Sequence, residues 1–189
     1  MKLAFQPTLP MIHYTLTDVS TLSEPTREDT GRWAVNASQG VNRGRVLEML
    51  NEALATEIVC VLRYRRHHFM ARGIYGQRVG AEFLTHSIEE QGHADKLAAR
   101  IVQLGGEPDF SPDRISARSH AEYVTGETLE EMIREDLMAE RISIDNYRSM
   151  IRYLGNEDSI TSMLLKQILA VEEEHADELA SLLEGFASA

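Results

Sequence analysis

Two Glu-x-x-His motifs lie far apart in the sequence, Glu90–His93 and Glu172–His175, and Ala-Asp follows each of them. Residues three positions apart lie on the same face of a helix, so each motif would present a carboxylate beside an imidazole. This combination of oxygen and nitrogen ligands suits iron, manganese or zinc. Two such motifs, with one glutamate from each of two further helices, make the ligand set of a dinuclear metal site in a four-helix bundle.

Two further glutamates interrupt apolar helical patterns. From about residue 43 to residue 72, apolar side chains recur at steps of three and four, and Glu57 stands in the middle of that stripe. A similar stripe begins at Thr128, which can form a capping box with Glu131, and contains Glu140. Because an unpaired glutamate is rarely buried, these positions indicate a functional layer inside the core.

The Glu-x-x-His motifs lie on two more predicted helices, one over about residues 78–104 and one from about residue 159 onwards. Short breaks containing glycine join the predicted helices in pairs, so each pair should form an antiparallel hairpin. About twenty residues without a helical period separate the pairs, enough at roughly 3.3 Å per residue to cross the length of a helix. We therefore predict an all-α four-helix bundle with a long crossover between helices two and three.

The predicted core glutamates lie near the middle of their helices, so they should meet at one level whichever way each helix runs. Glu57 precedes Glu90 by 33 residues and Glu140 precedes Glu172 by 32, so the two halves approximately repeat each other. The predicted metal ligands are Glu57, Glu90, His93, Glu140, Glu172 and His175.

Charge balance supports a metal site at this level. Ionised carboxylates in an apolar core cost several kcal/mol each unless they are compensated. Two divalent cations would compensate four carboxylates, so we predict two metal ions per chain. The alternative is a metal-free bundle whose carboxylates share protons. Open coordination positions would let iron or manganese react with O₂ or peroxide, whereas zinc would support only hydrolysis.

The composition sets further limits. The chain has 189 residues and a formal net charge of −11, which suits one sizeable domain and disfavours nucleic-acid binding. Residues 1–42 lack a lasting helical period, so we predict an extended N-terminal arm, followed by a bundle domain over residues 43–189. The apolar runs are too short to span a membrane, and we expect no signal peptide. The single cysteine, Cys60, fits a reducing compartment, so we expect a cytoplasmic protein.

Over about residues 43–186 the sequence resembles the bacterioferritins and, more widely, the ferritin-like di-iron proteins. The resemblance is most specific in Glu90–Leu97, in Glu172–His175, and in Tyr64, which stands seven residues after Glu57. It implies a ferritin-like bundle that binds two iron ions per subunit, with manganese or zinc as alternatives.

The resemblance also implies a role for each ligand. Glu57 and His93 resemble the terminal ligands of one iron, and Glu140 and His175 resemble those of the other. The bridging carboxylates would be the two remaining glutamates, Glu90 and Glu172. Tyr64 matches the family's tyrosine near the ferroxidase centre, where it is a candidate electron donor in O₂ reduction. A packed core tyrosine is the alternative.

The function that the resemblance implies is a ferroxidase, an enzyme that oxidises Fe(II) to Fe(III) with O₂ or H₂O₂ for iron storage and detoxification. The alternative is a redox enzyme without storage, such as a rubrerythrin-like peroxidase or a dimanganese catalase. With a single cysteine, the chain lacks the cysteine-rich electron-transfer module of a rubrerythrin, which weakens that version.

Two departures from bacterioferritin concern haem and assembly. The residue after the helix-two glutamate is Gln91, where bacterioferritins have the methionine that binds haem between subunits, so we expect no haem. Only fourteen residues follow His175, too few for the fifth helix that helps to build the larger bacterioferritin shell. The resemblance therefore favours a homo-oligomer, a twelve-subunit Dps-like shell with the metal site inside each bundle. A dimer is the alternative.

Residues near the predicted site carry secondary predictions. Asp136, one turn before Glu140, is a candidate acceptor for an imidazole N–H, with an ordinary solvated or capping role as the alternative. We expect Cys60 to be a small buried residue, with a redox role as its alternative. We expect His86 to be a surface histidine, with help in iron delivery as its alternative. A basic segment should form a solvated or inter-subunit face; its members are Arg63, Arg65, Arg66, His67 and His68. Three acidic residues should be solvated or guide ions, namely Glu89, Glu173 and Glu174.

Overall fold

The computed structural model describes residues 41–187, and every regular element in that range is a helix. The helices are α2 (Arg43–Met70), α3 (Gly76–Gln103), α4 (Pro112–Arg118), α5 (Leu129–Leu154) and α6 (Ser159–Ala187). The predicted all-α class is confirmed, and the four long helices begin and end within a few residues of the predicted positions. The predicted N-terminal arm, residues 1–42, lies outside the described residues except for its last two positions.

Local sequence signals set the ends of these helices. The side chain of Asn42 accepts a hydrogen bond from the Arg45 N–H at 3.2 Å and caps α2. Thr128 and Glu131 form the predicted capping box at the start of α5. α5 ends at Leu154, and its C-cap residue is Gly155, whose φ of 52° lies in the left-handed region that glycine adopts readily.

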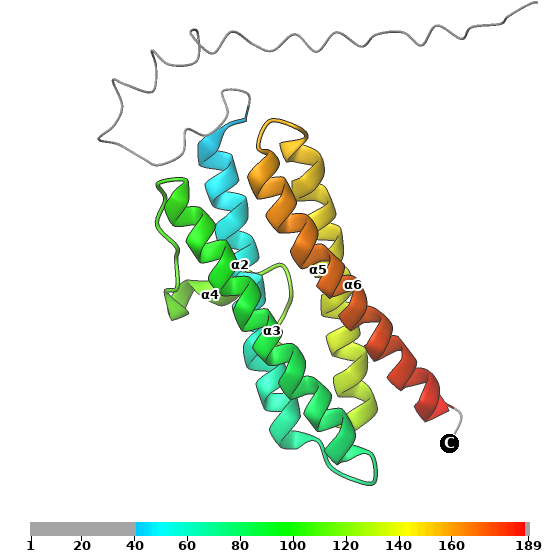
Figure 1. Cartoon of the computed structure of the whole chain (residues 1–189). Helices are drawn as coiled ribbons and strands as arrows, with labels where there is room; N and C mark the ends of the chain where they lie inside the picture. Colours follow the sequence, from blue (N-terminus) through cyan, green and yellow to red (C-terminus); the bar gives the residue numbers. More distant parts are fainter. Residues whose placement is uncertain (1–40, 188–189) are drawn as a thin grey trace, which may run out of the picture. The chain divides into compact units, whose positions relative to one another are not determined.

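The four long helices form two antiparallel hairpins, α2 with α3 and α5 with α6 (Figure 1). The hairpins pack so that α2 contacts α5 and α3 contacts α6. Because α3 and α5 run in the same direction, the chain must travel the length of the bundle between them (Figure 1). This topology confirms the predicted long crossover.

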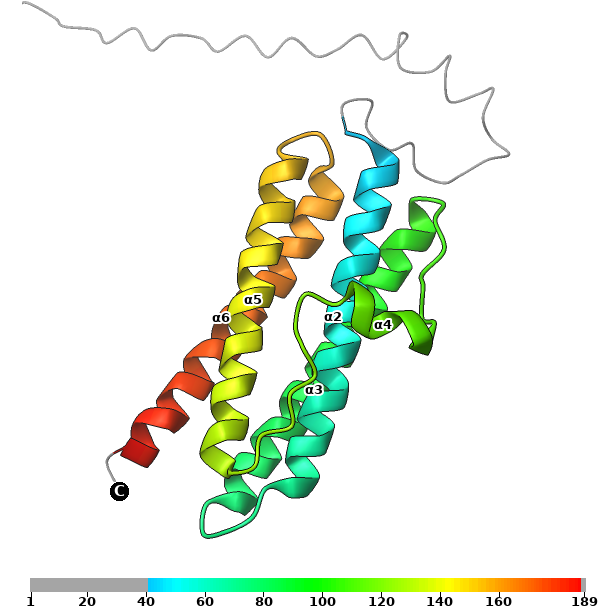
Figure 2. The same ribbon diagram turned by 180° about the vertical axis from the view of Figure 1, so that it is seen from behind.

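The crossover runs along the outside of the bundle, and α4 within it packs against α2 (Figure 2). The sequence pattern does not predict α4, because seven residues are too few to show a helical period. Asn51 of α2 fastens the beginning of the crossover. Its Oδ1 accepts a hydrogen bond from the Asp109 N–H at 2.8 Å, and its Nδ2 donates to the Glu107 carbonyl at 3.3 Å.

The apolar core is divided by the level of the predicted metal ligands. One cluster of buried apolar residues includes Leu54 of α2 and Ala94 of α3, and a second includes Cys60 and Phe83 of the same two helices. Glu57 and its counterparts on the other helices lie between the two clusters in sequence. The predicted site is therefore a polar layer with apolar packing above and below it.

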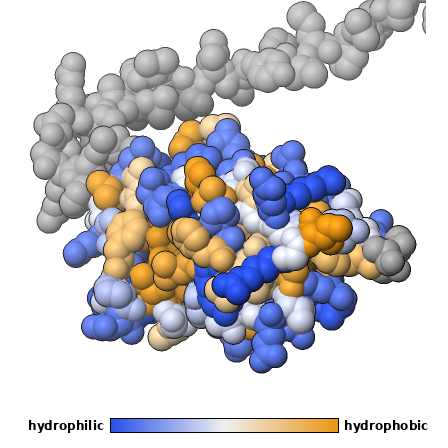
Figure 3. All heavy atoms as spheres, turned by 90° about the horizontal axis from the view of Figure 1, so that it is seen from below, coloured by the Kyte–Doolittle hydropathy of each residue, from blue (hydrophilic) through white to orange (hydrophobic). Residues whose placement is uncertain are grey.

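One end of the bundle exposes large apolar side chains. Phe69, near the end of α2, is 74% exposed, and Ile74, in the α2–α3 turn, is 91% exposed. Figure 3 views that end and shows hydrophobic residues gathered beside hydrophilic ones. Grouped apolar exposure of this kind is typical of surfaces that contact another protein. Among the described helices, none is long and apolar enough to cross a membrane.

A buried ion pair joins the two hairpins near the start of α6. Arg100 of α3 donates to Asp158 at 3.0 Å and to the hydroxyl of Thr161 at 2.7 Å. Asp158 also accepts a hydrogen bond from the Thr161 N–H at 2.9 Å, as an N-cap residue does. Burial alone would raise the pKa of Asp158, but the hydrogen bonds from Thr161 and the charge of Arg100 hold it below its usual value.

We predict that Asp158→Ala destabilises the fold by about 3 to 5 kcal/mol, because it leaves the buried Arg100 guanidinium without its partner. The free energy of unfolding from urea titrations at fixed protein concentration measures this loss. Asp145→Ala is the control, since that side chain is 83% exposed, and it should change stability by at most about 0.5 kcal/mol. Equal stabilities for the two variants would contradict the assigned role of the ion pair.

Candidate metal centre

The four long helices bring the six predicted ligands into one buried layer. Each of these side chains belongs to a residue that is at most 2% exposed. α2 contributes Glu57 and α5 contributes Glu140, while α3 and α6 each contribute a complete Glu-x-x-His motif. The layer thus contains one lone glutamate and one motif from each hairpin, as the approximate sequence repeat suggests.

Within this layer the side chains form two overlapping groups, in each of which one candidate ligand atom per residue lies within 4.8 Å of the others. The first group consists of Glu57, Glu90, His93 and Glu172. The second group consists of Glu90, Glu140, Glu172 and His175. Glu90 and Glu172 belong to both groups, which is the arrangement that two bridging carboxylates require. The assignment of the six residues as metal ligands stays a prediction.

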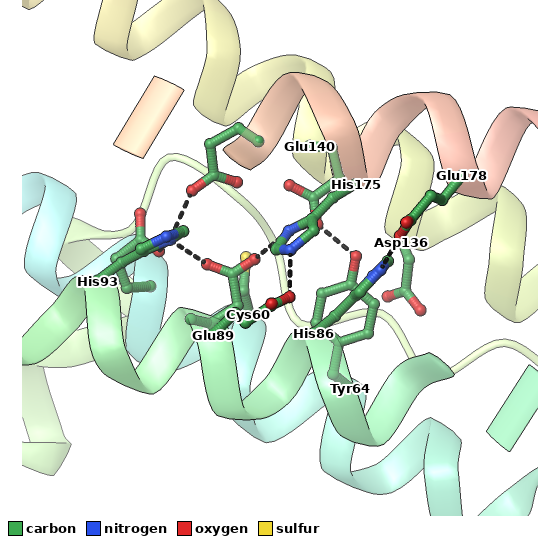
Figure 4. Close-up of polar contacts among 12 residues, drawn as sticks. Cys60, Tyr64, His86, Glu89, His93, Asp136, Glu140, His175 and Glu178 are labelled. Carbon is green, nitrogen blue, oxygen red and sulfur yellow. Dashed lines mark hydrogen bonds and ion pairs between the residues drawn. The ribbon is translucent and has the colours of Figure 1, made fainter. Parts of the chain in front are cut away.

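Figure 4 shows the imidazoles of His93 and His175 in the layer. Glu90 lies between them. Its Oε2 is 3.3 Å from Nδ1 of His93, and its Oε1 is 3.2 Å from Nδ1 of His175. Nδ1 of His93 is also 3.0 Å from Oε1 of Glu172. Both histidines therefore turn the same ring nitrogen towards the shared carboxylates.

Several carboxylate oxygens of the layer lack a hydrogen bond. Among the described residues, no hydrogen bond reaches Oε2 of Glu57, Oε2 of Glu140 or either oxygen of Glu172, although Oε1 of Glu172 is in ion-pair contact with His93. Buried polar atoms normally have a partner, and each exception needs an explanation. Oxygens that face a shared space without a donor are suited to divalent cations, so the residues present fit a pair of such ions.

Two tyrosines hold the lone glutamates in place. The Tyr64 hydroxyl donates to Glu140, and the Tyr147 hydroxyl donates to Glu57, so each bond joins α2 to α5. Sequence reasoning singled out Tyr64 but assigned no role to Tyr147. The sequence contains a signal that could have identified Tyr147, because it follows Glu140 by seven residues just as Tyr64 follows Glu57.

The carboxylates of the layer keep both histidines protonated when no metal is bound. Burial alone would lower the pKa of His93, but hydrogen bonds and charges from Glu57 and Glu90 outweigh it and raise the pKa to about 9. Burial would also lower the pKa of His175, but the hydrogen bond and charge of Glu90 and the charge of Glu140 outweigh it and raise the pKa to about 10.

The four carboxyl groups differ in charge because only one of them lies between both imidazoles. Burial alone would raise the pKa of Glu90, but hydrogen bonds within the layer outweigh it and hold the pKa below the usual range. Burial and the charge of Glu90 raise the pKa of Glu57 and of Glu172 well above the usual value, and they raise that of Glu140 as well. Glu90 is therefore the anionic centre of the layer.

The second ring nitrogen of His175 meets a carboxylate that was expected to be solvated or to guide ions. Nε2 of His175 is 2.8 Å from Oε2 of Glu89. A carboxylate on the outer nitrogen fixes which nitrogen faces a metal and makes it a better ligand. Glu89 thus has the position that the sequence analysis considered for Asp136.

Asp136 accepts an imidazole N–H, but the imidazole is that of His67 and not that of a predicted ligand. The expected solvated basic face is wrong for two of its members, since Arg63 and His67 are 1% and 0% exposed. Arg63 Nε and His67 Nδ1 each lie 2.8 Å from Asp136. The two side chains also reach backbone carbonyls of the crossover at Glu122 and Thr125. They are buried because they fasten the crossover to the bundle.

The expected surface position of His86 is also wrong. His86 is 0% exposed and stacks on His175 with the ring centroids 4.0 Å apart. Its Nε2 is 2.8 Å from Glu178. His86 lies one turn before Glu90, on the face of α3 that is turned towards the core, and is therefore buried. Cys60, as expected, is a small buried residue at 1% exposure.

Known proteins match this chain over most of its length. Residues 47–189 match the ferritin-like domain family. The chain belongs to the ferritin-like family. Bacterioferritin BfrA of Mycobacterium tuberculosis is 30% identical over 140 residues, which cover 74% of this chain and 84% of that protein. The bacterioferritin of Brucella melitensis is 33% identical over 146 residues, which cover 74% and 83%.

Solved structures resemble this ferritin-like chain as well. The bacterioferritin-related protein from Bacteroides fragilis, described as a dodecameric thioferritin, has a TM-score of 0.76 at 27% identity and covers 78% of this chain and 89% of its own. A ferritin-like di-iron carboxylate protein from Bacillus anthracis has a TM-score of 0.67 at 29% identity, with coverages of 75% and 96%. The predicted ferritin-like bundle is therefore confirmed.

We predict that Zn²⁺ binding at about pH 7 releases about two protons or more per chain, because His93 and His175 must lose their protons to bind a metal. Affinity should rise as the pH increases towards the pKa values of about 9 and about 10. The pH change of a weakly buffered solution during titration measures the release. Saturation without acidification would contradict the assigned charges.

We predict that Tyr147→Phe weakens metal binding by about 10- to 100-fold while the bundle stays folded, because Glu57 loses the donor that orients it. Tyr64→Phe should act in the same way through Glu140. Dissociation constants for Zn²⁺ and circular dichroism spectra measure the two properties. Tyr153→Phe, at a half-exposed position of α5, is the control, and an affinity equal to the control would refute the proposed positioning.

Proposed function

We propose that the chain is a ferroxidase that binds two Fe(II) ions per subunit in the buried layer and oxidises them with O₂ or H₂O₂. The observation that carries the proposal is the pair of overlapping ligand groups that share Glu90 and Glu172. Two cations held by common carboxylates lie close enough to deliver one electron each to the same oxidant. Two electrons and two protons convert O₂ to H₂O₂, or H₂O₂ to two waters.

The roles of the protein's own residues follow from their contacts. Glu57 and His93 would bind one iron and Glu140 and His175 the other, while Glu90 and Glu172 would bridge them. The two imidazoles release their protons to solvent when iron binds, and the two protons that the oxidant takes up come from solvent. The apolar clusters on both sides of the layer exclude bulk water from it. Tyr64 would act as an additional electron donor to the oxidant, and its hydrogen bond to Glu140 supports this role.

We further propose that subunits assemble into a closed twelve-subunit shell that stores the oxidised iron and so detoxifies it. The exposed apolar side chains at the α2–α3 end, such as Phe69 and Ile74, support subunit contacts. The formal net charge of −11 supports an acidic shell that attracts cations. The description of the related Bacteroides fragilis protein as dodecameric points to the same assembly.

We predict that Glu90→Ala lowers the initial rate of Fe(II) oxidation by at least about tenfold, because it removes a carboxylate shared by both ions. Oxidation is followed by absorbance after O₂ or H₂O₂ is added to anaerobically loaded protein of known particle mass. Asp95→Asn, at an exposed position of the same helix, is the control and should oxidise Fe(II) as the parent does.

Three outcomes separate the functions. Rapid oxidation followed by continued iron uptake in a large particle supports storage. Rapid peroxide turnover in a small particle, without uptake, would replace storage by a peroxidase or catalase function. A Glu90→Ala variant that oxidises Fe(II) as fast as the parent would refute the bridging role.

A further inference from the structure

Two more groups of potential metal ligands contain His86. One joins it to Glu140 and His175 of the buried layer, and the other lies beside the layer, outside the six predicted ligands. It consists of Glu82 and His86 of α3 and Glu178 of α6, and one ligand atom of each lies within 4.8 Å of the others. Nε2 of His86 is 2.8 Å from Oε2 of Glu178 and 3.9 Å from Oε1 of Glu82. One imidazole nitrogen and two carboxylates suit a divalent transition-metal ion.

The partners available in the protein do not fully account for the polar groups of this cluster. His86 is completely buried, and Nε2 is the ring nitrogen that it turns towards both carboxylates. Within residues 41–187, neither Glu82 nor Glu178 forms an ion pair with lysine or arginine. A divalent cation at this position would compensate the charge of both carboxylates.

The approximate repeat of the two hairpins shows that a histidine is not needed here for packing. His86 precedes Glu90 by four residues, and the equivalent position before Glu172 is Ile168. Ile168 is fully buried in an apolar cluster. The imidazole of His86, at the equivalent position of the α2–α3 hairpin, adds a polar group to the core. Such a group is costly to bury unless it binds a partner.

The cluster lies between the protein surface and the buried layer. The two carboxylate side chains, of Glu82 and Glu178, are 38% and 42% exposed and line a surface pocket of about 430 Å³. The other charged residues of the pocket are Arg78 and Asp177, so acidic groups predominate there. On the inner side, the His86 ring stacks on His175 at 4.0 Å, as Figure 4 shows for the row His93, His175, His86 and Glu178.

We propose that Glu82, His86 and Glu178 form a third, mononuclear site for a divalent transition-metal ion, which holds Fe(II) between the surface pocket and the dinuclear centre. Binding at this site does not depend on the proposed ferroxidase activity; the delivery of iron from it rests on that activity. The two half-exposed carboxylates would take the ion from solvent. Buried His86, whose ring stacks on His175, would hold the ion on its side away from the dinuclear centre.

The test uses Co²⁺ alone, bound anaerobically to the full chain and counted by equilibrium dialysis. The parent should bind about three Co²⁺ per chain and Glu178→Gln about two, because the amide is a poor ligand for the ion. Glu174→Gln is the matched control, since it makes the same change one turn earlier on α6 at an exposed position. It should bind as many ions as the parent.

A second variant separates metal binding from simple positioning. Glu82→Gln leaves the hydrogen bond between His86 and Glu178 intact, so a purely structural role for His86 predicts no change. The metal-site proposal predicts that the weakest of the three binding steps loses at least about tenfold in affinity. Anomalous diffraction from crystals soaked in Co²⁺ should show an ion beside Nε2 of His86.

The results also distinguish this proposal from the proposed function. Glu90→Ala should lose the paired ions but keep the ion at His86. A single ion at His86 in the parent would support the third site and refute the dinuclear one. An absence of anomalous density at His86, or unchanged binding in both Glu82→Gln and Glu178→Gln, would overturn the proposal.

Discussion

The structure depends on placing four carboxyl groups at one level of an apolar core. Mutual repulsion in a low-dielectric interior would expel them unless positive charge compensates them. The protein itself supplies only two imidazoles at this level, and Glu90 occupies the space between them. The remaining carboxyl groups keep raised pKa values and leave oxygens without donors. This imbalance means that the layer is not a self-sufficient polar network and that its residues could hold cations.

The rest of the bundle holds this layer rigid from both sides. Apolar clusters above and below fix the heights of the helices, and the buried pair of Arg100 and Asp158 joins the two hairpins at one end. Towards the other end, Arg63 and His67 share Asp136 and bind the crossover, which confines the longest connection of the described chain to one course. A site of this kind needs such support because its ligands must meet at fixed distances.

The two hairpins supply equivalent ligands but unequal surroundings. Each contributes a lone glutamate, a Glu-x-x-His motif and a tyrosine that holds the opposite glutamate. The equivalence ends at His86, where the other hairpin has the apolar Ile168. Apolar packing lies on both sides of the layer, but on one side a chain of polar groups also leads through His86 towards the surface pocket.

The sequence by itself determined the helices, their pairing and the six clustered side chains, because helical period, caps and motif spacing are local properties. Tyr147 was equally accessible through its seven-residue spacing from Glu140. Only the tertiary structure decided which polar residues near the site are buried and what they contact. Arg63, His67 and His86 are residue types expected at the surface, yet they are buried. Arg63 and His67 contact Asp136, and His86 contacts Glu178, each on another helix. A charged group is buried only when a partner from a distant segment pairs with it, and the local spacing of residues does not predict that partner.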